Sequence, residues 1–265
     1  MAMDISQIIA LAGLFFAAMA AGAINSIAGG GSLISFPALL AYGATHEISQ
    51  KMANATNNAA LVPGSIAGVI GFWEEVKRSK RLVAFMAIPS IVGGLLGAIL
   101  LSRTPEEIFQ RIVPFLVLFA TLLFAGRDQL NKLTRRGASD SDQITMTGGV
   151  VGFLLQLGIA TYGGYFGAGQ SLMMMAAFSI MGIRDIHEIN GLKTASAVMV
   201  NSVALAFFAT QGLIVWPVGL WMACGAIVGG YFAARISKRV PPRYLRWTVI
   251  IVGLTVSVIL FMRNF

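Results

Sequence analysis

The chain has 265 residues, of which 57% are hydrophobic and only 11% are charged. A soluble domain of this size would carry about 25% charged residues, so the composition excludes an ordinary soluble protein. The net charge of +8 does not indicate nucleic-acid binding, because the Lys and Arg residues lie in short loops between apolar segments, where membrane proteins carry their orientation signals. We therefore predict an all-α polytopic membrane protein in a lipid bilayer. The single cysteine, Cys224, lies within an apolar segment and is expected to be a buried core residue.

Ten apolar segments follow one another along the chain, five in each half. The first half carries them at about 8–28, 32–43, 53–72, 82–102 and 107–126, and the second at about 147–166, 171–182, 190–210, 214–235 and 244–262. A segment of 18 or more apolar residues can cross a hydrocarbon layer about 30 Å thick. The segments 32–43 and 171–182 reach only about half of that distance at 1.5 Å per residue. Depending on whether these two span the bilayer, we expect 8–10 membrane segments.

Short words recur in the same order in the two halves, which indicates an internal duplication. GGGS at Gly29–Ser32 matches GAGQ at Gly167–Gln170, and VGG at Val92–Gly94 matches VGG at Val228–Gly230. PGSIA matches VNSVA, and TPEEIFQR matches VPPRYLRW. The offset drifts only from 138 residues at the glycines to 136 at the VGG words. We predict one repeat over 1–126 and a second over 147–265, joined by a polar cytoplasmic linker over 127–146.

The basic residues predict that the second repeat is inverted relative to the first. Five segments per repeat, with both termini outside (periplasmic), place fourteen Lys and Arg residues inside and four outside, as the positive-inside rule requires. The inside set is Lys77, Arg78, Lys80, Arg81, Arg127, Lys132, Arg135, Arg136, Arg184, Arg235, Lys238, Arg239, Arg243 and Arg246; the outside set is Lys51, Arg103, Arg111 and Arg263. If residues 8–43 were one bent crossing, the basic loop 235–246 would face away from the other basic loops. The charges therefore favour a helical hairpin closed at the glycines.

The glycine hairpins predict a binding site for an anion near the middle of the bilayer. Irregular backbone survives at that depth only when it is buried in protein or lines a polar cavity. The short helices begin at their glycines, and in inverted repeats they approach from opposite sides, so their positive N-terminal ends would converge. Such ends bind anions through free N–H groups. Ser32 and Ser171 stand where a capping hydroxyl could contribute.

Glycine pairs elsewhere have a simpler explanation. Gly93 and Gly97 in the first half, and Gly225 and Gly229 in the second, are typical of close packing between membrane helices. We expect that role for them and not a role in binding. Packing alone remains the alternative explanation for the hairpin glycines, although polar residues surround those.

The segments that follow the hairpins are unusually polar for membrane helices. Lys193 is the residue of most interest, because an ionisable residue within a membrane segment usually faces a cavity or a pathway, and a cation would suit an anionic ligand. The alternative is that Lys193 reaches the cytoplasmic surface from near its segment's end. Asn201, with Asn57, Asn58 and Ser196, either lines the path or bonds across helices.

The predicted substrate-binding residues come from both hairpins and from both polar segments. They are Asn25, Ser26, Gly29, Gly30, Gly31, Ser32, Thr56, Asn57, Asn58, Tyr162, Gly163, Gly164, Gly167, Gly169, Gln170, Ser171, Lys193, Thr194 and Ser196. We find no metal-ligand cluster, no catalytic triad and no P-loop in the sequence, so we expect no metal, no bound cofactor and no enzymatic activity.

The quoted segments resemble the TauE/SafE family, also called TSUP permeases. The resemblance rests on AGAINSIAGGGSLISFPALLAYG with ANATNNAALVPGSIAG in the first half, and on YGGYFGAGQSLMMMAAFSIMG with INGLKTASAVMVNSVALAFF in the second. The resemblance implies an inner-membrane carrier of sulfur oxyanions or organosulfonates, sulfite export being the best-known role. By position, it implies that the glycine turns and the stretches Thr56–Asn58 and Lys193–Ser196 form the substrate region.

We therefore expect a secondary transporter that moves a small sulfur-containing oxyanion, sulfite or an organosulfonate, outward across the bacterial inner membrane by alternating access. The alternatives are an anion channel, or a membrane-embedded enzyme or scaffold for a lipid-like ligand. The expected partners are the anionic substrate and the bilayer, with no nucleic acid. The exact substrate and any assembly into homo-oligomers are not determined by the sequence.

Overall fold

The computed structural model describes residues 5–27, 29–126, 146–183, 185–236 and 242–264, and these form helices and turns without any strand. The first half forms α1 (Ile5–Ile27), α2 (Ser32–Gly43), α3 (Gln50–Gly71), α4 (Trp73–Arg78), α5 (Lys80–Arg103) and α6 (Glu106–Ala125). The second half forms α8 (Met146–Tyr165), α9 (Gln170–Ile180), α10 (Ile186–Thr210), α11 (Trp216–Ile236) and α12 (Pro242–Asn264). The all-α fold is thus confirmed. The predicted linker, except for its last residue, lies outside the described residues.

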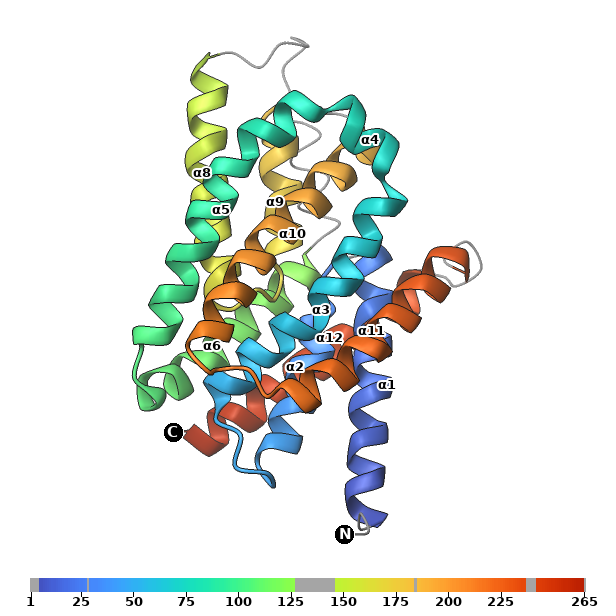
Figure 1. The fold of residues 1–265 in the computed structure, drawn as a ribbon, viewed down its shortest axis with the longest axis vertical. Coiled ribbons are helices and arrows are strands. Elements are labelled where there is room, and N and C mark those ends of the chain that lie inside the picture. Colours follow the sequence, from blue (N-terminus) through green and yellow to red (C-terminus); the bar gives the residue numbers. More distant parts are fainter. Residues whose placement is uncertain (1–4, 28, 127–145, 184, 237–241, 265) are drawn as a thin grey trace.

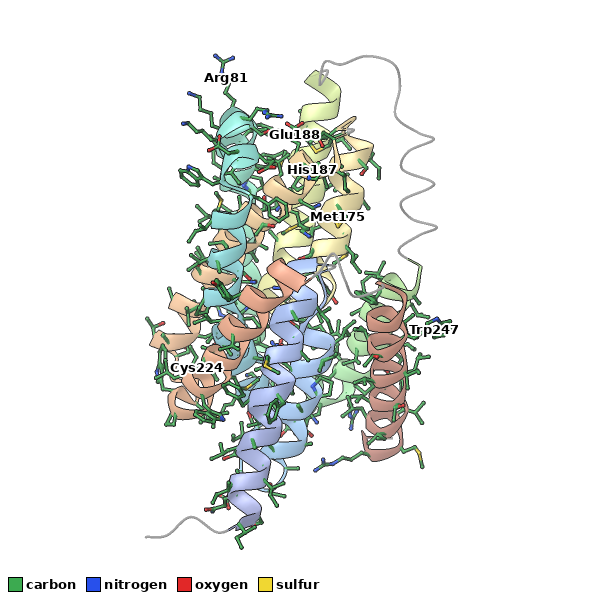
Figure 2. All side chains as sticks on the ribbon, turned by 90° about the vertical axis from the view of Figure 1, so that its right-hand side faces the viewer. Arg81, Met175, His187, Glu188, Cys224 and Trp247 are labelled. Atoms are coloured by element: carbon green, nitrogen blue, oxygen red, sulfur yellow. The ribbon has the colours of Figure 1, made fainter. Side chains whose placement is uncertain are left out.

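The distribution of polar and apolar side chains is that of a membrane protein. Among the described residues, four helices are long and apolar enough to cross a bilayer, namely Ile5–Asn25, Lys80–Arg103, Glu106–Ala125 and Ile186–Thr210. Large apolar side chains on the outer faces of these helices are exposed, as at Ile9, Ile88 and Phe115, where lipid would cover them. Cys224 is also exposed on the surface of α11, so its predicted place in the core is wrong (Figure 2). Polar side chains, in contrast, are buried in α3 and α10.

Hydrogen bonds between segments that are distant in the sequence show which turns lie at the same end of the molecule. At one end Ser79 Oγ donates to Glu188 Oε1 at 2.6 Å, which holds the α4 segment beside the start of α10; Figure 2 shows Arg81 near Glu188 there. At the other end Lys51 Nζ donates to Ser102 O at 3.0 Å, which holds the turn between α2 and α3 beside the turn between α5 and α6. We call these the α4 end and the α6 end.

The two short helices run in opposite directions from the centre of the molecule. From its glycine turn, α2 leads to the α6 end, whereas α9 leads from its own turn to the α4 end. Figure 1 shows the two hairpins, α1 with α2 and α8 with α9, entering the fold from opposite ends. This is the arrangement predicted for the hairpins.

Helix packing follows a reciprocal pattern between the two halves. The first segment of each half packs along the fourth segment of the other half, α1 against α11 and α8 against α5. The third segments, α3 and α10, pack on each other, and so do the last ones, α6 and α12. Exchanging the two halves would leave this set of neighbours unchanged. The pattern agrees with the predicted inverted repeats, which remain a prediction.

Glycines allow the closest of these contacts, because the helix backbones touch where side chains are missing. A Cβ built on Gly97 of α5 would overlap Thr161 O of α8, and one built on Gly229 of α11 would overlap Met19 O of α1. Gly93 and Gly225 meet the same two partner helices. The packing role predicted for these glycines is therefore confirmed, in the manner of small-residue contacts between membrane helices.

Gly97→Leu should destabilise the fold, because the added side chain would push α5 away from the backbone of α8. Overpacking of this kind costs about 1–3 kcal/mol, so the melting temperature of the purified protein in detergent should fall by about 5 °C or more. The matched control is Gly158→Leu on α8, where an added Cβ meets open space. Equal melting temperatures for the two variants would show that α5 and α8 do not pack as described.

Candidate functional site

The two glycine turns meet in the interior of the protein. Gly29 lies so close to the start of α9 that a Cβ built on it would be 2.8 Å from Ser171 Cβ. Gly29 and Gly30 adopt positive φ angles of 73° and 95°, and Gly167 and Gly169 adopt 81° and 80°, conformations that glycine reaches without steric cost. Each hairpin therefore closes through a left-handed turn that other residues adopt only with strain.

Glycine also stands at the N-cap position of both short helices, where the sequence suggested serine hydroxyls. The N-cap residues are Gly31 and Gly169, neither of which has a capping side-chain bond. Ser32 and Ser171 lie just inside the helices, so their predicted capping role is wrong. The glycine carbonyls accept several first-turn N–H groups, such as Leu172 N donating to Gly169 O at 3.0 Å. Within the described residues, the N–H groups of Ser32 and Ser171 donate to no backbone carbonyl.

Polar side chains hold the turn between α8 and α9 in place. Tyr162 Oη donates to Ala168 O across the turn at 2.7 Å. Asn54 Nδ2, from α3, donates to Tyr165 O at the end of α8 at 2.9 Å. These bonds satisfy carbonyl groups that the broken helix leaves without an intrahelical partner. Asn54 was not among the predicted residues.

A cluster of three amides joins the turn to both polar helices. Gln170 Nε2 and Asn58 Nδ2 both donate to Asn201 Oδ1, at 2.8 Å and 3.4 Å. Within the part of the chain that the structure describes, the amide oxygens of Gln170, Asn58 and Asn57 are buried and accept no hydrogen bond. We call Asn58, Gln170 and Asn201 the amide cluster. It ties α3, α9 and α10 together and fills the centre of the protein.

A cavity of about 520 Å³ lies between the amide cluster and the α4 end. Its lining comes from α1, α3, α9, α10 and α11, and it reaches Gly71 and Phe72 beside α4. Four predicted residues line it: Asn25, Ser171, Lys193 and Thr194. The lining residues that the sequence did not single out are Gly64, Ser65, Ala67, Gly68, Gly71, Phe72, Ala197, Ile227, Gly230 and Tyr231.

Lys193 is the charged residue of this lining. It lies in the second turn of α10, only 4% of its surface is exposed, and no Asp or Glu lines the cavity among the described residues. The alternative prediction, in which the Lys193 side chain extends to the cytoplasmic surface, is wrong because the residue is buried. Its neighbour Thr194 donates its hydroxyl to Asn190 O at 2.6 Å. Lys193 therefore lies in the same cavity as Ser171 of the first turn of α9.

The other predicted residues lie outside the cavity lining. Thr56 Oγ1 accepts a hydrogen bond from Val215 N at 3.0 Å, which joins α3 to the start of α11. Gly163 lies against the amide oxygen of Gln170, and Gly164 lies against Gly94 of α5. The remaining residues, Gly30, Gly31, Asn57, Gly167 and Ser196, are buried or half-buried around the turns and polar helices, and the side chain of Ser26 lies outside the described part.

Comparison with known proteins identifies the family. The model of the family described as "Sulfite exporter TauE/SafE" matches residues 14–260. "Probable membrane transporter protein YfcA" of Escherichia coli (strain K12) is 30% identical over 250 residues, which cover 92% of this chain and 87% of the relative. "Probable membrane transporter protein" of Haemophilus influenzae is 30% identical over 244 residues, covering 92% and 91%.

A more distant relative carries the same kind of name. "Probable membrane transporter protein ORF9" of Sinorhizobium sp is 27% identical over 248 residues, covering 94% of this chain and 91% of the relative. No solved structure matches the chain. The family match over most of the sequence and the names of these relatives, taken with the apolar helices, show that this chain belongs to the TauE/SafE family and is a multi-pass membrane transporter, not an enzyme.

Proposed function

We propose that this transporter moves a small sulfur-containing oxyanion, sulfite or an organosulfonate, out of the cell as a secondary carrier. The observation that carries the proposal is the burial of Lys193 in a cavity where the two hairpin tips meet. The sulfur chemistry comes from the family, whose printed description is a sulfite exporter. The buried lysine supports a negatively charged ligand.

The electrostatics of the cavity favour an anion. Lys193 supplies a cationic side chain, and the start of α9 adds its partial positive charge and the N–H of Ser171, which donates to no backbone carbonyl among the described residues. The hydroxyl groups of Ser65 and Ser171 and the amide of Asn25 line the same cavity. In a site that excludes most water, hydrogen bonds to a charged group are about twice as strong as neutral ones. A bound oxyanion that contacts Lys193 would stabilise the charged form of this side chain.

Corresponding positions in the two halves differ in burial, and this asymmetry supports alternating access. At an offset of 137 residues, the cavity residues Lys193 and Gly71 correspond to Thr56 and Phe208. Those counterparts are fully buried, and the Thr56 bond to Val215 N closes the fold near the α6 end. The cavity therefore reaches the α4 end, whereas the counterparts of these two lining residues are packed inside the protein. Exchanging the conformations of the two halves would produce the opposite state.

The same asymmetry favours a carrier over a channel. The amide cluster lies between the cavity and the α6 end, and its three residues are each at most 9% exposed. A conducting channel needs a continuous polar path, which these packed side chains interrupt. The positive-inside rule assigns the α4 end, with Lys77 and Arg78, to the cytoplasm of the inner membrane, and both termini to the outside. The cavity would then be open to the cytoplasm.

Lys193→Met should weaken anion binding while leaving the protein folded, because Met has a similar shape and replacing a buried charge with an apolar group is often neutral for stability. Loss of a charge-assisted hydrogen bond of about 1.5–3 kcal/mol lowers the affinity about tenfold to a hundredfold. A thermal-shift screen of the purified protein against sulfite, sulfate, thiosulfate, sulfoacetate and taurine measures this. The matched control is Lys77→Met, at an exposed position on α4. Unchanged affinity in Lys193→Met would remove Lys193 from the site.

Export should be driven by the membrane potential alone, since a potential of 100 mV, negative inside, moves each negative charge outward with about 2.3 kcal/mol. Purified protein in liposomes should therefore move sulfite against its gradient when such a potential is set. With the potential clamped at zero, net flux should run only down the gradient. Flux against the gradient at zero potential would show that another ion drives transport.

A further inference from the structure

The surface at the α4 end carries a dense cluster of basic side chains. Figure 2 shows Arg81 at the tip of this end, with its side chain pointing away from the helices. Ser79, in the middle of the cluster, is buried and bonded to Glu188, which fixes the chain and keeps its basic neighbours at the surface. We call these exposed neighbours the basic patch, which consists of Lys77, Arg78, Lys80 and Arg81.

Acidic residues at this end do not cancel the charge of the basic patch. Residues 73–81 contain two carboxylates, Glu74 and Glu75, so this segment keeps a net charge of +2. Glu75 packs against α10, since a Cβ built on Gly191 would be 3.0 Å from Glu75 Cβ. Asp185 caps the start of α10 through its side chain. The patch therefore presents an excess of positive charge at the surface.

An apolar surface continues from the basic patch along α5. Arg81 is followed on the same face of the helix by three exposed apolar side chains, at the spacing i+4, i+7 and i+11. They are Phe85, Ile88 and Val92, which are 41%, 60% and 44% exposed. From Arg81 to Val92 the helix rises about 16 Å. That rise is about half the thickness of the hydrocarbon layer, which is the depth of one leaflet.

An aromatic side chain lies beside the charged part of this surface. Trp73 is 55% exposed and stands one turn before Lys77, on the same face of α4. Trp is enriched at the level of the lipid headgroups, because its ring combines an apolar body with a polar N–H group. The basic patch, the aromatic ring and the apolar face of α5 thus match the headgroup, the interface and the acyl chains of a phospholipid.

We propose that this surface binds an anionic phospholipid, with its headgroup on the basic patch and one acyl chain along Phe85, Ile88 and Val92. The α4 end is the one that we assign to the cytoplasm, where anionic lipids attract basic segments. The site is separate from the cavity, and it does not depend on the identity of the substrate. Phe72, just before α4, lines the cavity, so a lipid that holds α4 against α10 also fixes the rim of the cavity.

The test is the melting temperature of the purified protein in detergent with dioleoylphosphatidylglycerol or dioleoylphosphatidylcholine added. These lipids have the same acyl chains, and the first has a net negative charge. Each basic residue near an anionic lipid surface strengthens association about fivefold, so the anionic lipid should raise the melting temperature about 5 °C more than the zwitterionic one. Equal rises would overturn the proposal. An equal rise with glycerol phosphate, which has no acyl chain, would also overturn it.

Neutralising the patch should remove most of the difference between the two lipids. The variant Arg78→Gln/Lys80→Gln/Arg81→Gln loses three charges, so its affinity for the anionic lipid should fall about 100-fold. An unchanged difference in this variant would show that the headgroup does not bind the patch. Arg78→Lys/Arg81→Lys keeps the charges and should keep the difference. A difference lost in this conservative variant as well would contradict a role for charge.

A control with the same loss of charge elsewhere tests whether position matters. Arg103→Gln/Arg111→Gln/Arg263→Gln removes three exposed basic residues that lie outside the patch, and it should keep the difference between the two lipids. Raising the salt concentration from about 0.05 M to about 0.5 M should shrink the difference in the unaltered protein, because salt screens exposed charges. A difference that depends equally on both sets of residues, or that salt leaves unchanged, would overturn the proposed site.

Discussion

A backbone N–H or C=O group inside a bilayer must find a partner within the protein, and this constraint shapes the molecule. Two of its helices are broken at glycines, which frees polar groups at a depth where lipid cannot satisfy them. The fold responds by burying both turns against each other, as the contact between Gly29 and Ser171 shows. It then supplies side-chain partners such as Tyr162 and Asn54 to the turn between α8 and α9.

The burial of both turns also explains why the centre of the protein is polar while its outer surface is apolar. The third segment of each half, α3 and α10, packs against the turns and carries Asn, Ser, Thr and Lys side chains inward. The amide cluster then joins these helices to α9 at the end of the cavity. Movement of one half relative to the other would have to break this cluster, since Asn58 and Asn201 come from different halves.

Much of this fold can be predicted from the sequence, because membrane segments are long, apolar and bounded by charges. The segment predicted at 32–43 coincides with α2, and that at 82–102 differs from α5 by two residues at its start and one at its end. The recurring glycine words correctly indicated two hairpins, and the polarity around Lys193 correctly pointed to a cavity. The helix caps could not be predicted from the local sequence, because serine and glycine are both common at N-cap positions. In the structure, the N-cap residues are the glycines of the tight turns, Gly31 and Gly169.

The parts of the site that the sequence did not reveal depend on contacts between distant segments. Ile227 and Tyr231 of α11 look like ordinary membrane-helix residues, and only the packing of α11 beside α3 turns them into a cavity wall. In the sequence, Asn54 is one of several polar residues in α3, and only the structure shows that it donates to Tyr165 O. Cys224 was misplaced for a related reason, because apolar context does not distinguish a lipid-facing position from a core position.

The central claim is that an oxyanion binds where the start of α9 meets Lys193. The most direct measurement is anomalous X-ray diffraction from crystals of the Cys224→Ser variant grown with selenite, a pyramidal oxyanion like sulfite whose selenium atom can be located. The account predicts a selenium peak within hydrogen-bonding reach of the Ser171 N–H group and Lys193 Nζ. A cavity without selenium, with peaks only at the protein surface, would contradict it.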